Sequence, residues 1–288
     1  MHTMHENKPY LIRSMTPDEV ERIAVEWAAK EGWNPGIYDA PCFYATDPQG
    51  FFAGFLGDEP IACISAVAYD PDFAFIGFYI VRSEYRGKGY GLKLWNAAIA
   101  YLQTQNIGLD GVVAQQENYK KSGFELAYRN IRYEGTAQST KEQFPEIVPV
   151  SEVAFDKIVQ YDAGIFPVPR PRFLQGWLKQ PESLALVALQ DGNVAGYSMI
   201  RKCRAGYKIG PLFAGNKDLA NKLFLASGNH VQPGTAIFLD TPAMNEAAVQ
   251  LAEHHGMKKV FETARMYTKS QPDIDLNRIY GVTTFELG

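Results

Sequence analysis

Apolar residues recur at helical spacing in two long segments of the first half of the chain. On the first segment, four of them fall on one helical face: Val20, Ile23, Ala24 and Trp27. Thr16 before Pro17 is a suitable N-cap, with acidic residues in the first turn, and we expect Gly32 to end this helix. A second helix is expected over residues 89–103, and a shorter one over 115–121.

Runs rich in aromatic and β-branched residues, separated by turn residues, predict the strands. They are expected at 10–13, 51–56, 60–68, 73–81, 109–113 and 128–133. Together with the helices they give the order β-α-β-β-β-α-β-α-β. This order favours the α/β class, with a mixed (α+β) sheet that carries helices on both faces.

The second half of the chain repeats features of the first at a nearly fixed offset. Leu56–Ser65 resembles Leu189–Ser198, and each segment reads as two strands joined by a tight acidic turn. At the same offset Ile76-Gly77 matches Ile209-Gly210, Gly123-Phe124 matches Gly256-Met257, and Arg132 matches Arg265, while Leu109-Asp110 resembles Leu239-Asp240 after a three-residue shift. Several matches in order predict two copies of one fold; the alternative is two unrelated halves with chance matches.

The boundary between the two copies is expected in a polar stretch with several helix and strand breakers. Residues 135–149 contain Gly135, Pro145 and Pro149 among Ser and Thr residues. We therefore predict a first domain over 1–134, a linker over 135–149 and a second domain over 150–288.

Composition and charge exclude several classes of protein. Of the 288 residues, 46% are hydrophobic and the net charge is −4, so no basic field points to nucleic acid or to an anionic membrane. The first eight residues are polar, and the longest apolar run, Phe73–Val81, is too short to span a membrane. Three separated cysteines without a CxxC spacing indicate a reducing compartment. We expect a cytoplasmic protein without a metal site; the oligomeric state stays open.

A glycine-rich loop lies between the apolar strand that ends at Val81 and the helix that follows. It consists of Arg86, Gly87, Lys88, Gly89, Tyr90 and Gly91. First-turn N–H groups of a helix are unpaired and bind phosphate, glycines let the backbone approach it, and the two cations add positive charge. The spacing differs from the dinucleotide fingerprint, and the Gly-Lys-Ser/Thr of a Walker A loop is absent. A glycine-rich turn without a ligand is the alternative.

The segment Val81–Leu92 resembles the acetyl-CoA signature of the GNAT superfamily, whose name denotes the general control N-acetyltransferase fold. The resemblance implies tandem GNAT folds of the acyl-CoA N-acyltransferase type. It implies that the backbone of Ile80 and Val81 pairs with the pantetheine arm of acetyl-CoA where neighbouring strands splay apart. The loop from Arg86 to Gly91, followed by Leu92, would hold the pyrophosphate.

A second resemblance lies in Tyr119-Lys-Lys-Ser-Gly123-Phe124, which is similar to the end of a helix in the same family. There the tyrosine protonates the leaving thiolate of coenzyme A; a packing tyrosine is the alternative for Tyr119. Many relatives carry a glutamate where this sequence has Gly77, so the general base is unassigned. A water chain, Tyr79 or an acid such as Asp39 are the candidates.

The acceptor side in such folds is the loop after the first helix. Trp33 and Phe43 offer aromatic walls, and Asp39 is a partner for an ammonium group. From the second half, Arg170, Arg172, Arg201 and Tyr207 are candidates to meet a substrate carboxylate. Packing and structural salt bridges are the alternatives for both groups.

The second half lacks the residues that carry the resemblance. The loop falls on Leu219–Phe224, which holds no glycine, and Tyr119 falls on Ala252. The chain thus resembles bacterial two-domain members with a catalytic first copy and a degenerate second copy. We expect the second copy to buttress the first and to line its acceptor pocket.

The combined prediction is an N-acetyltransferase. It would transfer an acetyl group from acetyl-CoA, without a metal, to the primary amine of a small molecule by direct attack of the neutral amine on the thioester. Two alternatives stay open: an enzyme that acetylates a lysine or the N-terminus of a protein, and a non-catalytic coenzyme A-binding regulatory module.

Overall fold

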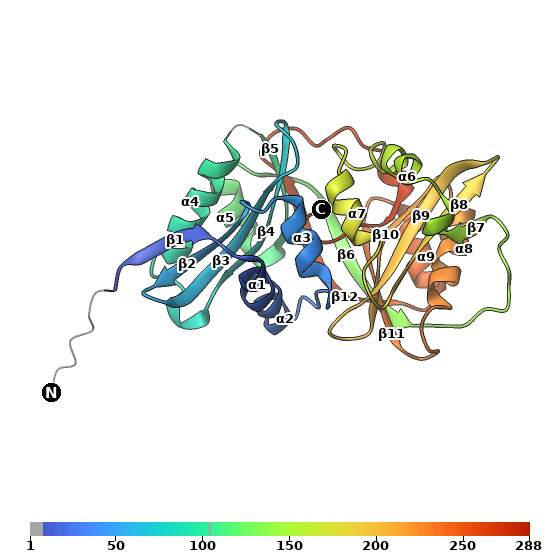
Figure 1. The fold of residues 1–288 in the computed structure, drawn as a ribbon, viewed down its shortest axis with the longest axis horizontal. Coiled ribbons are helices and arrows are strands. Elements are labelled where there is room, and N and C mark those ends of the chain that lie inside the picture. Colours follow the sequence, from blue (N-terminus) through green and yellow to red (C-terminus); the bar gives the residue numbers. More distant parts are fainter. Residues whose placement is uncertain (1–7, 104) are drawn as a thin grey trace.

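One mixed sheet of 13 strands runs through the computed structural model, which describes residues 8–103 and 105–288 (Figure 1). The elements of the first half are β1 (Tyr10–Ser14), α1 (Pro17–Glu19), the π-helical η1 (Val20–Val25), α2 (Glu26–Lys30), α3 (Asp39–Thr46), β2 (Phe51–Leu56), β3 (Glu59–Ala68), β4 (Phe73–Val81), η2 (Ser83–Tyr85), α4 (Tyr90–Leu102), β5 (Asn106–Val112), η3 (Val113–Gln115), α5 (Gln116–Lys121) and β6 (Glu125–Thr136).

The second half follows the same plan. Its elements are β7 (Ile147–Pro149), η4 (Val150–Glu152), α6 (Phe155–Asp162), α7 (Pro171–Trp177), β8 (Ser183–Gln190), β9 (Asn193–Lys202), β10 (Tyr207–Ala214), α8 (Lys217–Gly228), β11 (Ala236–Pro242), α9 (Glu246–His254), β12 (Lys258–Tyr267), η5 (Leu276–Arg278) and β13 (Ile279–Gly281). The α/β class and the mixed sheet expected from the sequence are confirmed.

Local signals placed most elements of the first half. Thr16 Oγ1 accepts a hydrogen bond from the Glu19 amide, and the Glu19 carboxylate accepts one from the Thr16 amide, so the predicted N-cap forms a capping box. The chain leaves α2 through Gly32, whose φ of +79° favours glycine. Helix α3 differs from the sequence-based expectation, which places no element between Gly32 and Phe51.

The two halves exchange strands in the centre of the sheet. The strand order is β1-β2-β3-β4-β5-β12-β6-β11-β10-β9-β8-β7, so β12 of the second half lies between β5 and β6. β12 pairs antiparallel with β5 from Thr263↔Val112 onward, while β6 pairs antiparallel with β11. Each half therefore completes its sheet with the last long strand of the other half.

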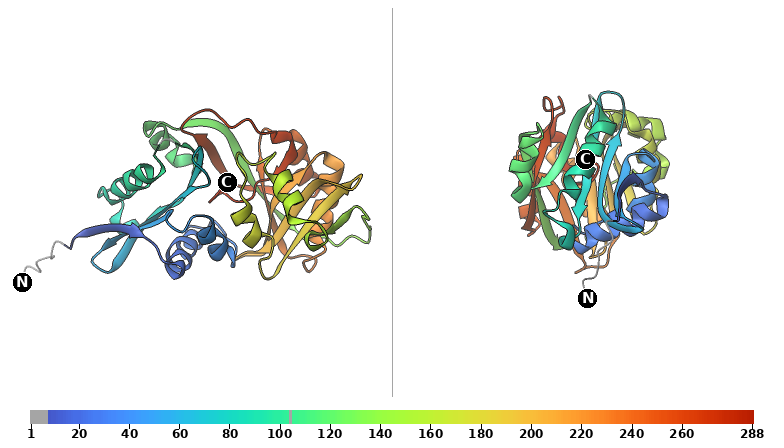
Figure 2. Two further views of the ribbon diagram at one scale, coloured as in Figure 1. Left: turned by 45° about the horizontal axis from the view of Figure 1, so that its top comes forward. Right: turned by 90° about the vertical axis from the view of Figure 1, so that its left-hand side faces the viewer.

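The largest core cluster lies between the two halves. It joins Phe43 and Phe78 of the first half to Trp177 and Tyr197 of the second, all fully buried or nearly so. The residues after β13, 282–288, run into the middle of the molecule, where the C label stands in Figure 1 and in both views of Figure 2. Leu287 in this segment is completely buried. The segment thus lies where first-half and second-half elements meet.

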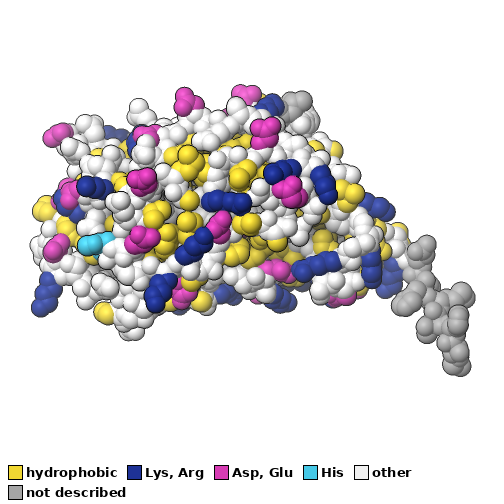
Figure 3. Space-filling model, turned by 180° about the vertical axis from the view of Figure 1, so that it is seen from behind, with side chains coloured by type: hydrophobic (Ala, Val, Ile, Leu, Met, Phe, Trp, Pro, Cys, Tyr) yellow, Lys and Arg dark blue, Asp and Glu magenta, His cyan; other side chains and the backbone are white. Residues whose placement is uncertain are grey.

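The surface carries charges of both signs. Seen from behind, lysine and arginine side chains alternate with aspartate and glutamate across the described face, so this face shows no field of a single sign (Figure 3). Among the described residues, no helix combines the length and hydropathy that crossing a membrane requires.

Candidate active site

Strands β4 and β5 separate part of the way along their length. Their parallel pairing covers only Phe73–Ile76 against Asn106–Leu109, although β4 continues to Val81. A β-bulge lies where the strands part: Ser65 pairs with Gly77 and Cys63 with Ile80, and Phe78 in between has a φ of +49°. A bulge bends its strand and re-aims the following side chains.

A cavity of about 640 Å³ opens between the separated strand ends. Its first wall is the backbone and side chains of Gly77–Val81, and its second wall is the end of β5 from Leu109 to Val112. The glycine-rich loop, the start of α4 and Tyr119 of α5 line one end. Trp33, Phe261, Phe285 and Glu286 line another part. Both halves of the chain therefore contribute walls.

The loop between β4 and α4 has the backbone expected of an anion-binding turn. Gly89 is the N-cap of α4 with a φ of +82°, and Gly87 has a φ of +74°. A Cβ built on either glycine would meet no heavy atom within 4 Å, so both face open space. Both line the cavity, as do Arg86, Gly91 and Leu92.

Three further loop side chains show how the loop is held. Arg86 donates from Nε to the Val81 carbonyl at 2.7 Å and pairs with Glu31 at 2.7 Å. Lys88 and Tyr90 do not line the cavity: the Lys88 ammonium lies 5.5 Å from the centre of the Tyr85 ring, and Tyr90 packs on Tyr10. Their side chains thus belong to the outer rim of the loop.

Tyr119 lies against the aromatic floor of the cavity. Its ring centre is 5.7 Å from that of Trp95. A Cβ built on Gly111 would come within 2.3 Å of the Tyr119 ring, so position 111 requires glycine. Burial, and secondarily the neighbouring Tyr79, raise the pKa of Tyr119 to about 12. Burial also raises the pKa of Tyr79 above its usual value. Both phenols therefore keep their protons at neutral pH.

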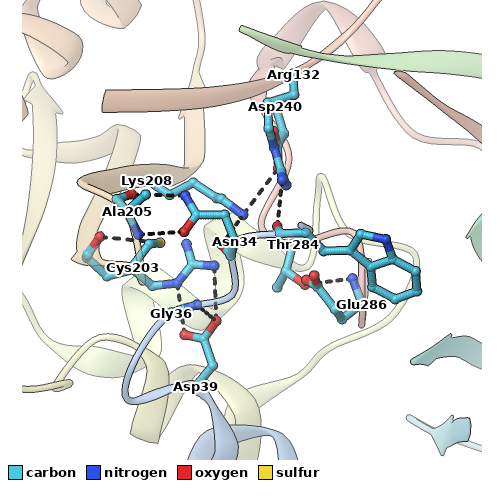
Figure 4. Close-up of polar contacts among 12 residues, drawn as sticks. Asn34, Gly36, Asp39, Arg132, Cys203, Ala205, Lys208, Asp240, Thr284 and Glu286 are labelled. Atoms are coloured by element: carbon cyan, nitrogen blue, oxygen red, sulfur yellow. Dashed lines mark hydrogen bonds and ion pairs between the residues drawn. The ribbon is translucent and has the colours of Figure 1, made fainter. Parts of the chain in front are cut away.

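The face of β4 that carries Gly77 meets the segment 282–288. A Cβ built on Gly77 would lie 2.0 Å from the Glu286 carbonyl oxygen, a contact that no other residue could make without displacing the segment. The Glu286 side chain is 3% exposed and lines the cavity. Thr284 donates from Oγ1 to Glu286 Oε2 at 2.5 Å (Figure 4).

Several expected acceptor residues lie away from the cavity. Asp39 is fully buried: it accepts from the Gly36 amide at 2.8 Å and pairs with Arg201 at 2.9 Å (Figure 4). Phe43 is a core residue stacked on Trp177. These side chains join the halves, because burying a charge requires a partner and burying a ring requires packing. Of the expected loop residues, Trp33 does line the cavity.

The remaining second-half candidates are also placed elsewhere. Arg170 is buried and pairs with Asp162 at 2.8 Å. Arg172 is exposed, and Tyr207 packs near His230. None of these three side chains lines the cavity.

A cluster of buried charges lies behind Trp33 and Glu286. Arg132 donates to Asp240 at 2.6 and 2.7 Å and to the Trp33 carbonyl at 2.6 Å (Figure 4). Lys208 donates to the Asn34 carbonyl at 3.1 Å. Burial, together with nearby Arg132, lowers the pKa of Lys208. The cluster fixes the Trp33 loop of the first half on strands of the second.

Sequence reasoning missed the second-half residues of the cavity: Phe261, Thr263, Phe285 and Glu286. No local motif marks them, since they reach the cavity through the strand exchange and the segment after β13. The one available signal was Gly77, a glycine where a side chain is usual in the family that the loop resembles. Among the described residues, no group of three or more His, Cys, Asp or Glu side chains is arranged to hold a metal ion.

The matching position of the second half is filled by the chain itself. β10 pairs in parallel with β11 only over Tyr207–Ile209, and the two strands then part as β4 and β5 do. β13 enters there, pairing with β10, while the Tyr280 carbonyl accepts from Thr241 of β11. α8 has a side-chain N-cap, Asn216, at the place where α4 has its glycine loop. This copy thus has neither the gap nor the loop.

Comparison with known proteins finds a related domain in each half of the chain. The Acetyltransferase (GNAT) family model matches residues 17–124, and an Acetyltransferase (GNAT) domain model matches residues 158–281. Holothin acyltransferase from Pseudoalteromonas sp. (strain SANK 73390) is 31% identical over 285 residues, which cover 99% of this chain and 97% of that protein. The chain therefore belongs to the GNAT superfamily. It is an acyltransferase with two GNAT domains, so the predicted repeat is confirmed.

Weaker relatives and solved structures agree on the fold. An uncharacterized N-acetyltransferase from Bacillus subtilis (strain 168) is 24% identical over 83% of this chain and 86% of its own. A candidate acetyltransferase from Pyrococcus horikoshii superposes over 100% of both chains with a TM-score of 0.82 at 22% identity. A tandem GNAT protein from the clavulanic acid biosynthesis pathway covers 91% of this chain and 100% of its own, with a TM-score of 0.64 at 11% identity. Enzymes of this family use acetyl-CoA or another acyl-CoA as the donor.

Proposed function

We propose that the protein transfers an acetyl group from acetyl-CoA to the primary amine of a small molecule, with the first domain as the catalytic one. The observation that carries the proposal is the cavity between the separated ends of β4 and β5, which joins the glycine loop and Tyr119 to an aromatic pocket. These are the parts that an acyl-CoA thioester and an acceptor need at one place.

The residues present fit an acyl-CoA. The backbone of Ile80 and Val81 on the free edge of β4 would pair with the pantetheine arm, and the N–H groups of the loop from Gly87 to Gly91 would face the pyrophosphate. Arg86 is half exposed and would add a cation there. The second domain offers no equivalent, because β13 fills its gap. The donor supplies an activated acyl group, whose thiolate is a fair leaving group.

The acceptor pocket supports a small, partly apolar amine. Its walls are the rings of Trp33, Phe261 and Phe285, with one carboxylate, Glu286. Aromatic rings and a carboxylate together favour an organic ammonium group. The relative that is 31% identical is named for a single acceptor, holothin, which supports an acceptor of defined structure.

In the proposed reaction the neutral amine attacks the thioester carbonyl directly. The C–N bond forms, the C–S bond breaks, and Tyr119, protonated at neutral pH, gives its proton to the leaving sulfur. Backbone N–H groups at the bulge of β4 would polarise the carbonyl. Asp39 is withdrawn as a candidate base, since it is paired with Arg201 in the core. Tyr79 is a poor base, because burial raises its pKa and the phenol therefore stays protonated at neutral pH.

The test is amine-dependent release of free coenzyme A thiol. Acetyl-CoA would be incubated with the protein and a panel of arylalkyl amines, aliphatic amines and a lysine peptide, with products identified by mass spectrometry. We expect thiol release that requires a small amine and yields the acetylated amine. A Gly89→Trp variant, which fills the loop, should lose this activity. Turnover of the peptide alone would favour protein acetylation, and binding without turnover of any acceptor would favour the regulatory alternative.

A further inference from the structure

We propose that Glu286, brought into the first domain by residues 282–288, is the general base that accepts the proton of the acceptor amine. This inference rests on the proposed function, because it assigns a role within the same cavity.

The backbone of Glu286 lies directly against Gly77 of β4. Gly77 occupies the strand position at which many relatives carry a glutamate. A Cβ there would lie 2.0 Å from the Glu286 carbonyl oxygen and 3.0 Å from its Cα. The Glu286 backbone thus fills the space that a side chain at position 77 would need. Glycine at 77 therefore leaves room for the backbone of the segment that carries the Glu286 side chain into the cavity.

Glu286 also differs from the other acids of the cavity. Three acids line it: Glu31, Asp110 and Glu286. Glu31 is paired with Arg86 at 2.7 Å, and Asp110 with Arg265 at 2.5 Å. Among the described residues, Glu286 has no cation within salt-bridge distance, and its Oε1 accepts no hydrogen bond. Among the three acids, Glu286 is thus the one that is not held by a cation.

The segment that carries Glu286 is firmly held. Thr284 Oγ1 accepts from the amides of Glu286 and Leu287 at 2.8 and 3.3 Å while it donates to the carboxylate. Arg170 donates to Thr283 Oγ1 at 2.8 Å, and Tyr69 donates to the Leu287 carbonyl at 2.9 Å. A base must be kept within hydrogen-bond reach of the proton that it takes, and these contacts fix the carboxylate on rigid elements.

The charges around Glu286 come from four strands. Arg132 on β6, Arg201 on β9 and Lys208 on β10 each interact electrostatically with Glu286. Their close partners are Asp240 on β11, and Asp39 of α3 for Arg201. The cations lie behind the carboxylate as a fixed field.

The proposed step moves one proton from the amine to Glu286 and one proton from Tyr119 to sulfur. The amine nitrogen attacks the thioester carbonyl carbon of the acyl-CoA while Glu286 Oε1 accepts one proton from that nitrogen. The C–N bond forms, and the C–S bond breaks with its electron pair on sulfur, which takes the proton of Tyr119. The proton on Glu286 and the one that Tyr119 has lost are exchanged with solvent, so no oxidant or further reactant is needed.

The test compares Glu286→Gln with wild type and with Glu146→Gln, a control in which a glutamate paired with Lys222 far from the cavity is neutralised. The acceptor is the best amine found in the panel, or 2-phenylethylamine if several are equal. We expect the acetyl-CoA dissociation constant to stay within about threefold, and kcat/KM at pH 7 to fall about 100-fold, the usual lower range for a lost general base. The control should match wild type.

A merely structural role would not allow chemical rescue. Formate, a small carboxylate, should restore part of the activity of Glu286→Ala if the lost group is the base. If these variants do not fold by thermal unfolding, Glu286→Asp keeps the charge but shortens the reach, and should lose at least about tenfold in kcat/KM.

Two results overturn the inference separately. If wild type turns over an amine, Glu286→Gln stays within about threefold of it and formate does not rescue Glu286→Ala, then Glu286 is excluded as the base while the proposed function stays intact. No amine-dependent thiol release by wild type overturns the proposed function and this inference with it.

Discussion

Tyr119 shows how one residue obtains its properties from its surroundings. It packs against Trp95 and beside Gly111, and burial raises its pKa to about 12. Desolvation disfavours the phenolate, so the raised pKa extends the pH range in which Tyr119 still holds its proton. The residue thus still holds its proton when a thiolate leaves, although the raised pKa makes it a weaker acid than an ordinary tyrosine, so its help to the leaving group is modest.

Replacing Tyr119 by Phe should lower kcat only about tenfold. The phenyl ring keeps the packing, and a thiol whose pKa is about 8.5 leaves fairly well without protonation, so the loss should lie below the usual range for an acid catalyst. Because Tyr119 stays protonated up to about pH 12, wild type should show no decline between pH 8 and 10 that the Phe variant lacks. A decline near pH 10 that disappears in Tyr119→Phe would show an unshifted tyrosine. Steady-state rates over pH 6–10 measure both.

Residues were predictable where the chemistry is local. The glycine loop could be recognised because the strand, glycines and helix that make it are contiguous, and the same holds for the Thr16 capping box. Asp39 was misplaced because its partner, Arg201, arrives from the other half. Glu286 could not be found for the same reason: only the fold brings it to Gly77.

At the scale of elements, the exchange of β6 and β12 decides which of the repeated Asp and Arg residues pair with each other. Arg132 of β6 pairs with Asp240 of β11, and Arg265 of β12 pairs with Asp110 of β5. Pairing within each half would satisfy the same residue types. The strand patterns are alike in both halves, so the sequence predicts the strands and their alternation but leaves open which half each strand joins. Packing of the complete chain decides it.

The buried pair Arg132–Asp240 should be costly to break. Arg132→Met leaves Asp240 buried with only Lys208, at 3.9 Å, as a counter-charge, and should lower the free energy of unfolding by about 3–5 kcal/mol. The matched control is Arg82→Met, which breaks an ion pair with the exposed Glu59 and should cost less than about 1 kcal/mol. Urea unfolding followed by fluorescence measures both. Equal losses in the two variants would contradict the proposed importance of the buried cross-pair.

At the scale of the whole molecule, the two domains follow the same plan but differ at the gap in their strands. Two GNAT domains share one sheet, but the first keeps an open gap between β4 and β5, while the second closes its own gap with β13. The chain then continues from β13 into the first domain and supplies Phe285 and Glu286 to its cavity. We propose that the second domain, having lost its donor site, completes the acceptor site of the first.

This arrangement predicts a single donor site per chain. Calorimetric titration with acetyl-CoA should show a stoichiometry of about one, and Arg86→Ala should weaken binding about tenfold, since it removes a charge-assisted contact to the pyrophosphate. Arg82→Ala is the control, since Arg82 is a neighbouring arginine that pairs with Glu59 and Glu84 outside the cavity; it should bind as wild type does.

The most direct test of the account is this titration on wild type beside Gly89→Trp. The account predicts that acetyl-CoA binds wild type at one site and that the tryptophan, placed on a glycine with a φ of +82° at the start of α4, abolishes binding while the protein remains folded. Undiminished binding to Gly89→Trp, or no binding to wild type, would contradict a donor site between β4 and β5.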